Sequence, residues 1–111
     1  MEIKDALEVL DGLSHETRLD VFRLLVKAGP AGLPAGSIAD TLGARQNTMS
    51  SHLKQLHQAR LIGSRRDGRS VIYSANYDTA RQLIQFLMED CCAGNAAVCE
   101  PIARSLGKIC N

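Results

Sequence analysis

Three cysteines near the end of the chain have a spacing that suits a thiol site. Cys91 and Cys92 are adjacent, and Cys99 follows after a six-residue spacer. Consecutive Cα atoms lie about 3.8 Å apart, shorter than the roughly 4.4–6.8 Å usual for a disulfide, so the adjacent pair is strained as a cystine. It is a better chelating edge for a soft ion. Because trivalent arsenic or antimony can take three thiolates in a pyramid, we predict all three cysteines as its ligands.

Other uses of these cysteines stay open. A structural zinc site takes four ligands, and Cys110 could supply a fourth sulfur. A disulfide between Cys99 and one of the adjacent pair would instead make the chain a redox-sensing regulator. An oxidoreductase is a further alternative, but the acidic Glu89 and Asp90 disfavour the thiolate that such a nucleophile needs, so we expect no enzyme and no organic cofactor. Free cysteine can also be a small buried apolar residue.

A second group of polar residues lies on one face of a predicted helix over residues 46–60. Met49, Leu53, Leu56 and Ala59 recur at helical spacing and predict a packed face. The other positions carry short donors and acceptors, as base edges in a DNA major groove require. A solvated helix face is the alternative, and for the histidine a hydrogen bond within the protein. The predicted DNA contacts on this helix are Gln46, Asn47, Thr48, Ser50, Ser51, His52 and Lys54.

A short helix and two strands frame this polar face. Residues 37–42 predict a helix that stops at Gly43, which tolerates a left-handed C-terminal turn. Residues 61–66 and 69–74 predict two strands joined at Asp67-Gly68, a strong signal for a two-residue hairpin. Two helices, a tight turn and a hairpin together indicate a winged helix-turn-helix.

Basic residues concentrate in this region. Residues 45–69 hold six basic side chains and one acidic side chain, a balance of +5, so the rest of the chain carries −4 within a total of +1. Arg65, Arg66 and Arg69 lie near the hairpin tip, where they could reach phosphates or a minor groove. We therefore add these three arginines to the predicted DNA contacts.

Apolar periodicity predicts three more helices. They would hold in place the helix over residues 46–60 that carries the predicted DNA contacts, here called the reading helix. Ser14 is expected to cap a core helix that runs to about residue 28, and Asp78 to cap a last helix over residues 79–90. The last helix carries an apolar stripe that suits a core or a dimer surface. An N-terminal helix is expected to have one narrow apolar face, made of Ile3, Ala6, Leu7 and Leu10.

With 111 residues, the chain is expected to form one winged DNA-binding and dimerisation domain over residues 1–92, followed by a flexible tail over residues 93–111 that carries Cys99. The expected class is mainly α with a β-hairpin wing. The N-terminus has acidic residues where a secretory signal has basic ones, and no apolar run approaches the ~20 residues that span a bilayer. We therefore expect a cytoplasmic protein without membrane contact.

Three motifs carry a resemblance to a known family over roughly residues 3–92. They are Leu13-Ser14-His15-Glu16-Thr17-Arg18-Leu19, Ser50-Ser51-His52-Leu53-Lys54-Gln55-Leu56 and Arg66-Asp67-Gly68-Arg69-Ser70-Val71-Ile72-Tyr73. In this order they resemble the ArsR/SmtB family of dimeric, metal-responsive repressors. The resemblance implies a homodimer with N- and C-terminal helices at its interface, bound to double-stranded operator DNA. Two positions depart from the pattern, because Asn47 stands where many members carry Pro and Arg60 where many carry Gly.

The resemblance also bears on the inducer. Family members that sense zinc with the last helix carry His and carboxylate ligands there, and many arsenic sensors carry Cys-x-Cys in the helix before the reading helix. Residues 38–43 contain no cysteine. The sequence therefore resembles the arsenic-responsive subgroup with three thiols at the C-terminal end, and we expect release of the operator when trivalent arsenic or antimony binds.

Overall fold

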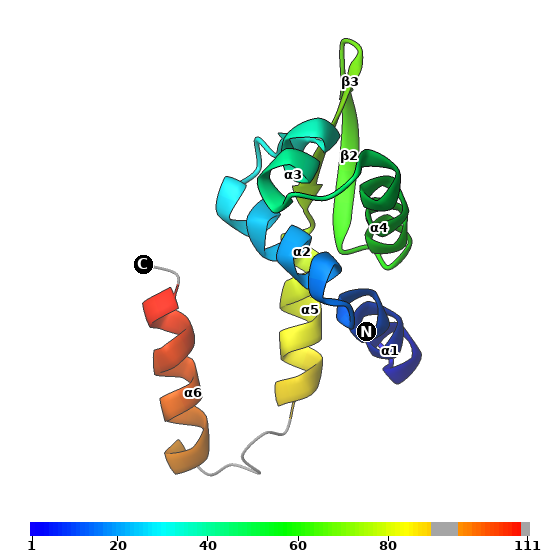
Figure 1. The fold of residues 1–111 in the computed structure, drawn as a ribbon. Helices are drawn as coiled ribbons and strands as arrows, with labels where there is room; N and C mark the ends of the chain where they lie inside the picture. The colour runs from blue at the N-terminus through cyan, green and yellow to red at the C-terminus, as the bar shows by residue number, and fades with distance from the viewer. Residues whose placement is uncertain (90–95, 110–111) are drawn as a thin grey trace.

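The computed structural model of this chain describes residues 1–89 and 96–109, without the side chains of residues 96, 99, 108 and 109. The described part contains six helices and one three-stranded sheet, which confirms a mainly α winged helix-turn-helix with a β-hairpin wing. In chain order (Figure 1) the elements are α1 (Ile3–Leu13), α2 (Glu16–Ala28), β1 (Leu33–Pro34), α3 (Ala35–Leu42), α4 (Gln46–Gln58), β2 (Ile62–Asp67), β3 (Ser70–Ala75), α5 (Tyr77–Met88) and α6 (Ala96–Ile109).

The core forms where helices α1 to α4 meet the sheet. Val9, Val21, Leu25, Ile38 and Leu56 have no exposed surface. Complete burial of an aliphatic side chain contributes about 1.5–3 kcal/mol, so these residues dominate the packing. Helix α2 contacts α1, α3, α4 and β3, which confirms it as the core helix.

The sheet has the strand order β1-β3-β2, with both pairs antiparallel. The predicted hairpin is confirmed, but its turn lies one residue later than expected, because Asp67 pairs with Ser70 and leaves Gly68 and Arg69 as the turn. Gly68 has a φ of +63°, as the first position of a Gly-X hairpin turn requires. The short strand β1 was not predicted, since only two residues form it and one is Pro34. In Figure 1 the hairpin projects at the end of the molecule opposite α5 and α6.

Polar contacts close the junction between α1 and α2. The Arg18 Nε donates a hydrogen bond to the Gly12 carbonyl at 2.7 Å, and the Ser14 hydroxyl donates to another carbonyl of α1. These bonds satisfy carbonyls at the end of α1 that have no partner within the helix. The expected Ser14 cap of α2 is therefore wrong. His15 is the cap, because its Nδ1 accepts a hydrogen bond from the Thr17 N–H at 3.1 Å.

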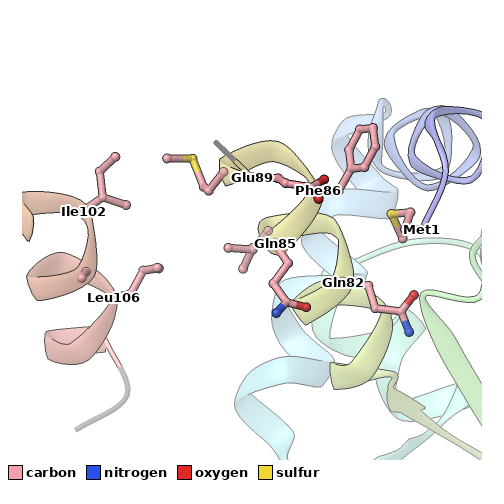
Figure 2. Close-up of a pocket in the computed structure, with 10 residues that line it drawn as sticks. Met1, Gln82, Gln85, Phe86, Glu89, Ile102 and Leu106 are labelled. Atoms are coloured by element: carbon pink, nitrogen blue, oxygen red, sulfur yellow. The ribbon is translucent and has the colours of Figure 1, made fainter. Parts of the chain in front are cut away.

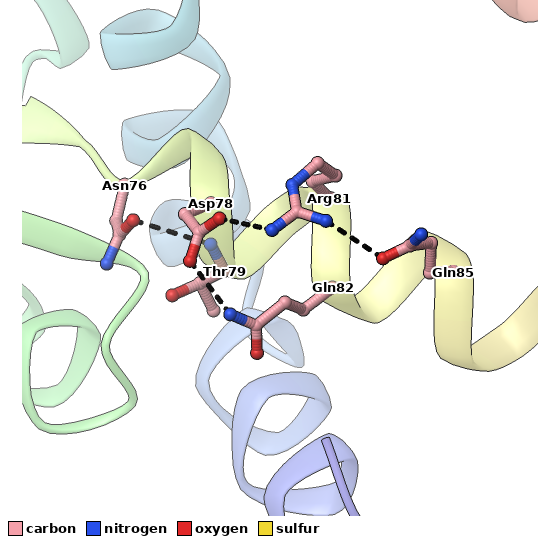
Figure 3. A network of polar contacts seen from close by, with 6 residues as sticks. All are labelled: Asn76, Asp78, Thr79, Arg81, Gln82 and Gln85. Atoms are coloured by element: carbon pink, nitrogen blue, oxygen red, sulfur yellow. Dashed lines mark hydrogen bonds and ion pairs between the residues drawn. The ribbon is translucent and has the colours of Figure 1, made fainter.

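Helix α5 follows the wing directly, and its cap is Asn76. The Asn76 Oδ1 accepts a hydrogen bond from the Thr79 N–H at 3.4 Å. The expected Asp78 cap is wrong, since Asp78 lies inside the first turn and its carboxylate accepts hydrogen bonds from Arg81 and Gln82 (Figure 3). The hydrogen bond from Arg81 holds the Asp78 pKa below its usual value. A carboxylate there also suits the positive end of the helix dipole.

Helix α1 divides its apolar residues between two faces. Ala6 and Val9 are buried against the core, whereas Ile3, Leu7 and Leu10 are exposed on the other side. The single apolar face expected from the sequence is thus two faces, and only one of them packs within the chain. We call Ile3, Leu7 and Leu10 the outer face of α1.

Helix α6 occupies most of the segment that was expected to be a tail, residues 93–111. It contains Pro101 and Gly107, the two residue types least favourable inside a helix, which explains why the local sequence did not indicate one. In the part of the chain that the structure describes, no helix combines the length and apolarity needed to cross a membrane.

Candidate nucleic-acid interface

Helices α3 and α4 form the predicted helix-turn-helix. Helix α3 starts at Ala35, two residues earlier than expected, and ends before Gly43, whose φ of +65° confirms the left-handed turn. Helix α4 begins at Gln46, as predicted, and ends at Gln58 instead of residue 60. Strand β2 contacts α4, so the wing lies beside the helix that was expected to read DNA (Figure 1).

One face of α4 is packed and the opposite face is open. Met49, Leu53 and Leu56 are at most 2% exposed and Ala59 is 8% exposed, which confirms the predicted packing face. Packing on that side fixes the rotation of the helix and turns its polar residues outward. The exposed residues among the predicted contacts on α4, here called the reading face, are Gln46, Asn47, Thr48, Ser50, Ser51 and Lys54.

Two hydrogen bonds lie within the reading face. The Ser50 hydroxyl donates to the Gln46 carbonyl at 2.9 Å, and the Asn47 Oδ1 accepts from the Thr48 N–H at 2.9 Å. The Asn47 amide group still offers its donors, and the Ser50 oxygen still offers acceptor capacity. These groups therefore suit hydrogen bonds to base edges or phosphates.

His52 is placed differently from the reading face. Its ring is half-buried, and the centroid lies 4.5 Å from that of His15, the cap of α2. Burial lowers the His52 pKa, and the charges of His15 and Arg18 lower it further. A neutral ring held against α2 favours the internal role considered for this histidine over a contact with DNA.

The three arginines of the wing have different surroundings. The Arg65 guanidinium donates hydrogen bonds to the carbonyls of Ala31, at 2.7 Å, and Pro30, at 3.5 Å. Arg65 therefore ties strand β2 to the loop before β1. Arg66 and Arg69 are exposed and form no hydrogen bond or ion pair with any described residue, so their guanidinium groups are available to a phosphate.

Arg60 lies apart from the reading face, although it was counted among the six basic residues of residues 45–69. Its φ is +64°, the left-handed conformation that follows many helices and that glycine adopts most easily. The Arg60 guanidinium lies 3.3 Å from the Asp5 carboxylate on α1. The other Asp5 oxygen accepts the Glu2 N–H at 3.0 Å, and these contacts lower the Asp5 pKa. At this position, where the resemblance led us to expect glycine, the arginine side chain thus links α1 to the end of α4.

Arg45 is a candidate contact that the sequence analysis did not include. It is exposed and lies directly before α4, at the N-cap position, where its side chain makes no hydrogen bond to the helix, and it is next to the reading face. Its charge adds to that of the helix N-terminus, where N–H groups without helical partners attract anions. The signal available in the sequence was a basic residue directly before the predicted reading helix.

The predicted thiol ligands fall mostly outside the described residues. Cys91 and Cys92 lie there entirely, as does Cys110, and for Cys99 only the backbone position within α6 is described. Among the side chains that the structure describes, which exclude that of Cys99, His, Cys, Asp and Glu do not gather in threes that could hold a metal ion. The thiol site therefore stays a prediction.

Sequence comparisons match a helix-turn-helix domain over residues 13–65. Nodulation protein NolR from Rhizobium meliloti is 29% identical over 80 residues, covering 72% of this chain and 63% of NolR, so the chain spans just under two thirds of that relative. The HTH-type transcriptional regulator YgaV from Escherichia coli is 28% identical over 89 residues, covering 80% of this chain and 88% of YgaV.

Structure comparisons agree on the fold. An ArsR-like transcriptional regulator from Rhodococcus has a TM-score of 0.68 at 24% identity, covering 96% of this chain and 90% of that one. A homodimeric winged helix-turn-helix domain from Mycobacterium bovis has a TM-score of 0.65 at 24% identity, with coverages of 79% and 82%. A structure described as a possible transcriptional regulator for arsenical resistance has a TM-score of 0.64 at 25% identity, with coverages of 72% and 80%.

Proposed function

We propose that this chain, a winged helix-turn-helix regulator of the ArsR family, represses transcription as a homodimer on operator DNA and releases the DNA when trivalent arsenic or antimony binds its thiols. The observation that carries DNA binding is the division of α4 into a packed face, with Met49, Leu53 and Leu56 buried, and an open polar face beside a basic wing. The reading face then enters the major groove, while Arg66 and Arg69 contact the backbone or the minor groove.

Dimerisation is supported by an apolar surface that the chain leaves uncovered. The outer face of α1 is exposed, with 68% of Ile3 and 60% of Leu7 accessible, and Leu87 on α5 is 55% exposed. The winged domain from Mycobacterium bovis is described as homodimeric. In a twofold dimer, two reading helices would meet half-sites separated by one turn of DNA, roughly 34–36 Å.

The chemistry of the donor set supports the choice of inducer. Cys91, Cys92 and Cys99 offer three sulfur ligands, which suits a soft trivalent ion better than a four-coordinate structural zinc. Along the chain, the adjacent pair follows α5 and Cys99 lies within α6. A solved relative is described as a possible regulator for arsenical resistance, which supports the same inducer.

Coupling between the thiol site and the DNA-binding surface is a difference in binding free energy. Thiolates gathered at the end of α5 would alter a helix that the proposed dimer uses, and thereby the spacing of the reading helices. For a 100-fold loss of operator affinity, the ion must bind the DNA-free dimer about 2.7 kcal/mol more tightly than the DNA-bound dimer.

The test is fluorescence anisotropy of the protein on its upstream DNA, titrated with arsenite under reducing conditions. We expect release for the natural chain and for the control Cys110→Ser, and retention for Cys91→Ser, Cys92→Ser and Cys99→Ser. Equal release by all five proteins would refute the thiol site. Release by an oxidant without arsenite would favour the redox-sensing alternative, and failure to bind DNA at all would refute the function.

A further inference from the structure

We propose that His15 and His52 form a pH-sensitive pair that positions the reading helix, so that the protein holds operator DNA while both rings are neutral and releases it when they take up protons. The inference rests on the proposed function and adds to it a second control that needs neither a metal nor an oxidant. Both histidines are positioning residues, because they act on DNA through the placement of α4.

The two rings join the start of α2 to the middle of α4. His15 directly precedes α2, His52 lies halfway along α4, and their ring centroids are 4.5 Å apart with the ring planes inclined at 45°. His52 is half-buried, between the packed residues Met49 and Leu53 and the exposed reading face. Since a helix moves as one body, a shift of His52 away from α2 also shifts the reading face.

The neutral form of His15 is the form that this arrangement fits. The His15 Nδ1 accepts a hydrogen bond from the Thr17 N–H at 3.1 Å, which requires a nitrogen without a proton. A proton on this atom would set two donors against each other and would remove the cap of α2. It would also place a positive charge at the positive end of the helix dipole.

The charged groups that act on His52 are basic. Burial of the ring lowers the His52 pKa, and the charges of His15 and Arg18 lower it further. Arg18 donates hydrogen bonds to the carbonyls of Gly12, at 2.7 Å, and Asp11, at 3.3 Å, and forms no ion pair with any described residue. Its charge therefore persists beside the two rings, and protons taken up by both rings would add to it.

The other elements that contact α4 are α1, α3 and β2. The ionisable side chains of these elements and of α4 itself are Lys4, Asp5, Glu8, Asp11, Asp40, Lys54, His57, Arg65, Arg66 and Asp67. Asp5 pairs with Arg60, which follows α4. Glu8 and Asp11 line a pocket whose α4 wall lies beyond His52, toward the end of the helix. The charges that act on the His52 ring remain the two basic ones, so a protonated pair is repelled and not neutralised.

The pair belongs to a different part of the chain from the proposed thiols. Cys91 and Cys92 follow α5, and α5 and α6 line a cavity of about 660 Å³ together with Met1 (Figure 2). His15 and His52 belong to neither of these helices. Control by protons can therefore be tested separately from control by arsenite.

The direction of the pH effect separates this inference from a direct DNA contact. If the protonated pair does not fit the DNA-bound form, protons bind the free protein better, and by reciprocity acid weakens the complex. A histidine that contacts a phosphate has the opposite effect, because its positive charge strengthens DNA binding in acid.

Fluorescence anisotropy on the upstream DNA, without arsenite and under reducing conditions, measures this effect between about pH 7.5 and pH 5.5, where histidine titrates. We expect the natural chain to lose affinity about 10-fold over this range, and His52→Gln and His15→Asn to change less than about twofold. Asparagine keeps an acceptor for the Thr17 N–H, so α2 retains its cap. The matched control is His57→Gln, which removes an exposed histidine of the same helix and should keep the natural profile.

Three results would overturn the inference. Tighter binding of the natural chain in acid would show that His52 faces a phosphate. A profile shared by the natural chain and the variants His52→Gln and His15→Asn, or one flattened equally by His57→Gln, would place the pH effect outside the pair. Loss of helical circular dichroism over the same range would assign the release to unfolding.

Proton NMR titration of the imidazole rings tests the pair without DNA. In His15→Asn the His52 pKa should rise, because a neighbouring positive charge is removed, and in His57→Gln it should stay the same. An unchanged His52 titration in His15→Asn would overturn the inference even if DNA binding is found. Failure of the natural chain to bind DNA at any pH, with the two histidines still coupled, would instead refute the proposed function and the release that rests on it.

Discussion

Replacing Arg60 isolates the cost of its backbone conformation. At φ = +64°, an L-residue with a side chain is disfavoured by roughly 1–2 kcal/mol, and glycine is not. The ion pair with Asp5 offsets part of that cost, but the two side chains are 57% and 39% exposed. Exposed pairs contribute about 0.2–1 kcal/mol, so the pair does not fully compensate for the strain.

The comparison of Arg60→Gly with Arg60→Ala gives a prediction of sign. Both variants lose the guanidinium, so their difference reports the backbone alone. We expect Arg60→Gly to be more stable than Arg60→Ala by about 1 kcal/mol, the reverse of the order at an ordinary helical position, where glycine is the less stable by roughly 0.5–1 kcal/mol. Relative to the natural chain, we expect Arg60→Ala to be slightly less stable.

Urea denaturation followed by circular dichroism, at one fixed protomer concentration because a dimer's stability depends on it, measures these differences. A control variant, Asp5→Asn, keeps an acceptor for the Glu2 N–H and removes the charge that pairs with Arg60. Asp5→Asn should lower the free energy of unfolding by no more than Arg60→Ala does. If Arg60→Gly is no more stable than Arg60→Ala, the left-handed strain at this position does not exist.

Three further predictions concern DNA affinity, the pH dependence of stability and backbone packing. Arg66→Ala should reduce the slope of log affinity against log salt by about 1.8 for the dimer, since one phosphate contact per subunit is lost, and anisotropy titrations at several salt concentrations would measure it. Folding lowers the pKa of His52 below 6.5, so the stability linked to its neutral ring is present above pH 6.5 and is lost as the pH falls through the folded pKa. The variant His52→Gln should therefore flatten the acid side of a plot of unfolding free energy against pH. Gly32→Ala should destabilise the fold more than Gly29→Ala in thermal melts: both glycines have positive φ, but only at Gly32 would a Cβ lie 2.3 Å from a backbone oxygen. Equal melting shifts would contradict that packing argument.

Much of the fold followed from local patterns. The apolar spacing of Met49, Leu53 and Leu56 predicted the packed face of α4, and Gly43 predicted the left-handed turn before it. Both signals are local, because helical periodicity and the freedom of glycine act within a few residues. The exposure of the polar residues of the reading face was predictable for the same reason, as they occupy the positions that the apolar residues leave.

Caps and turns were less predictable, because neighbouring residues compete for them. Ser14 and Asp78 are good caps by type, yet His15 and Asn76 hold those positions. The Ser14 hydroxyl bonds to the end of α1, and the Asp78 carboxylate bonds within α5. The energies that decide between such partners differ by about 1 kcal/mol, which residue type alone does not resolve.

The sequence by itself determined the packed and open faces of the reading helix, the hairpin and the basic balance of this region, because periodicity and residue type set them locally. Only the tertiary structure decided which of those basic side chains stay available to contact a phosphate. It turned Arg60 toward α1, tied Arg65 to a loop and set His52 against His15. Each of these contacts joins residues far apart in the chain, so the folded backbone alone brings the partners within reach.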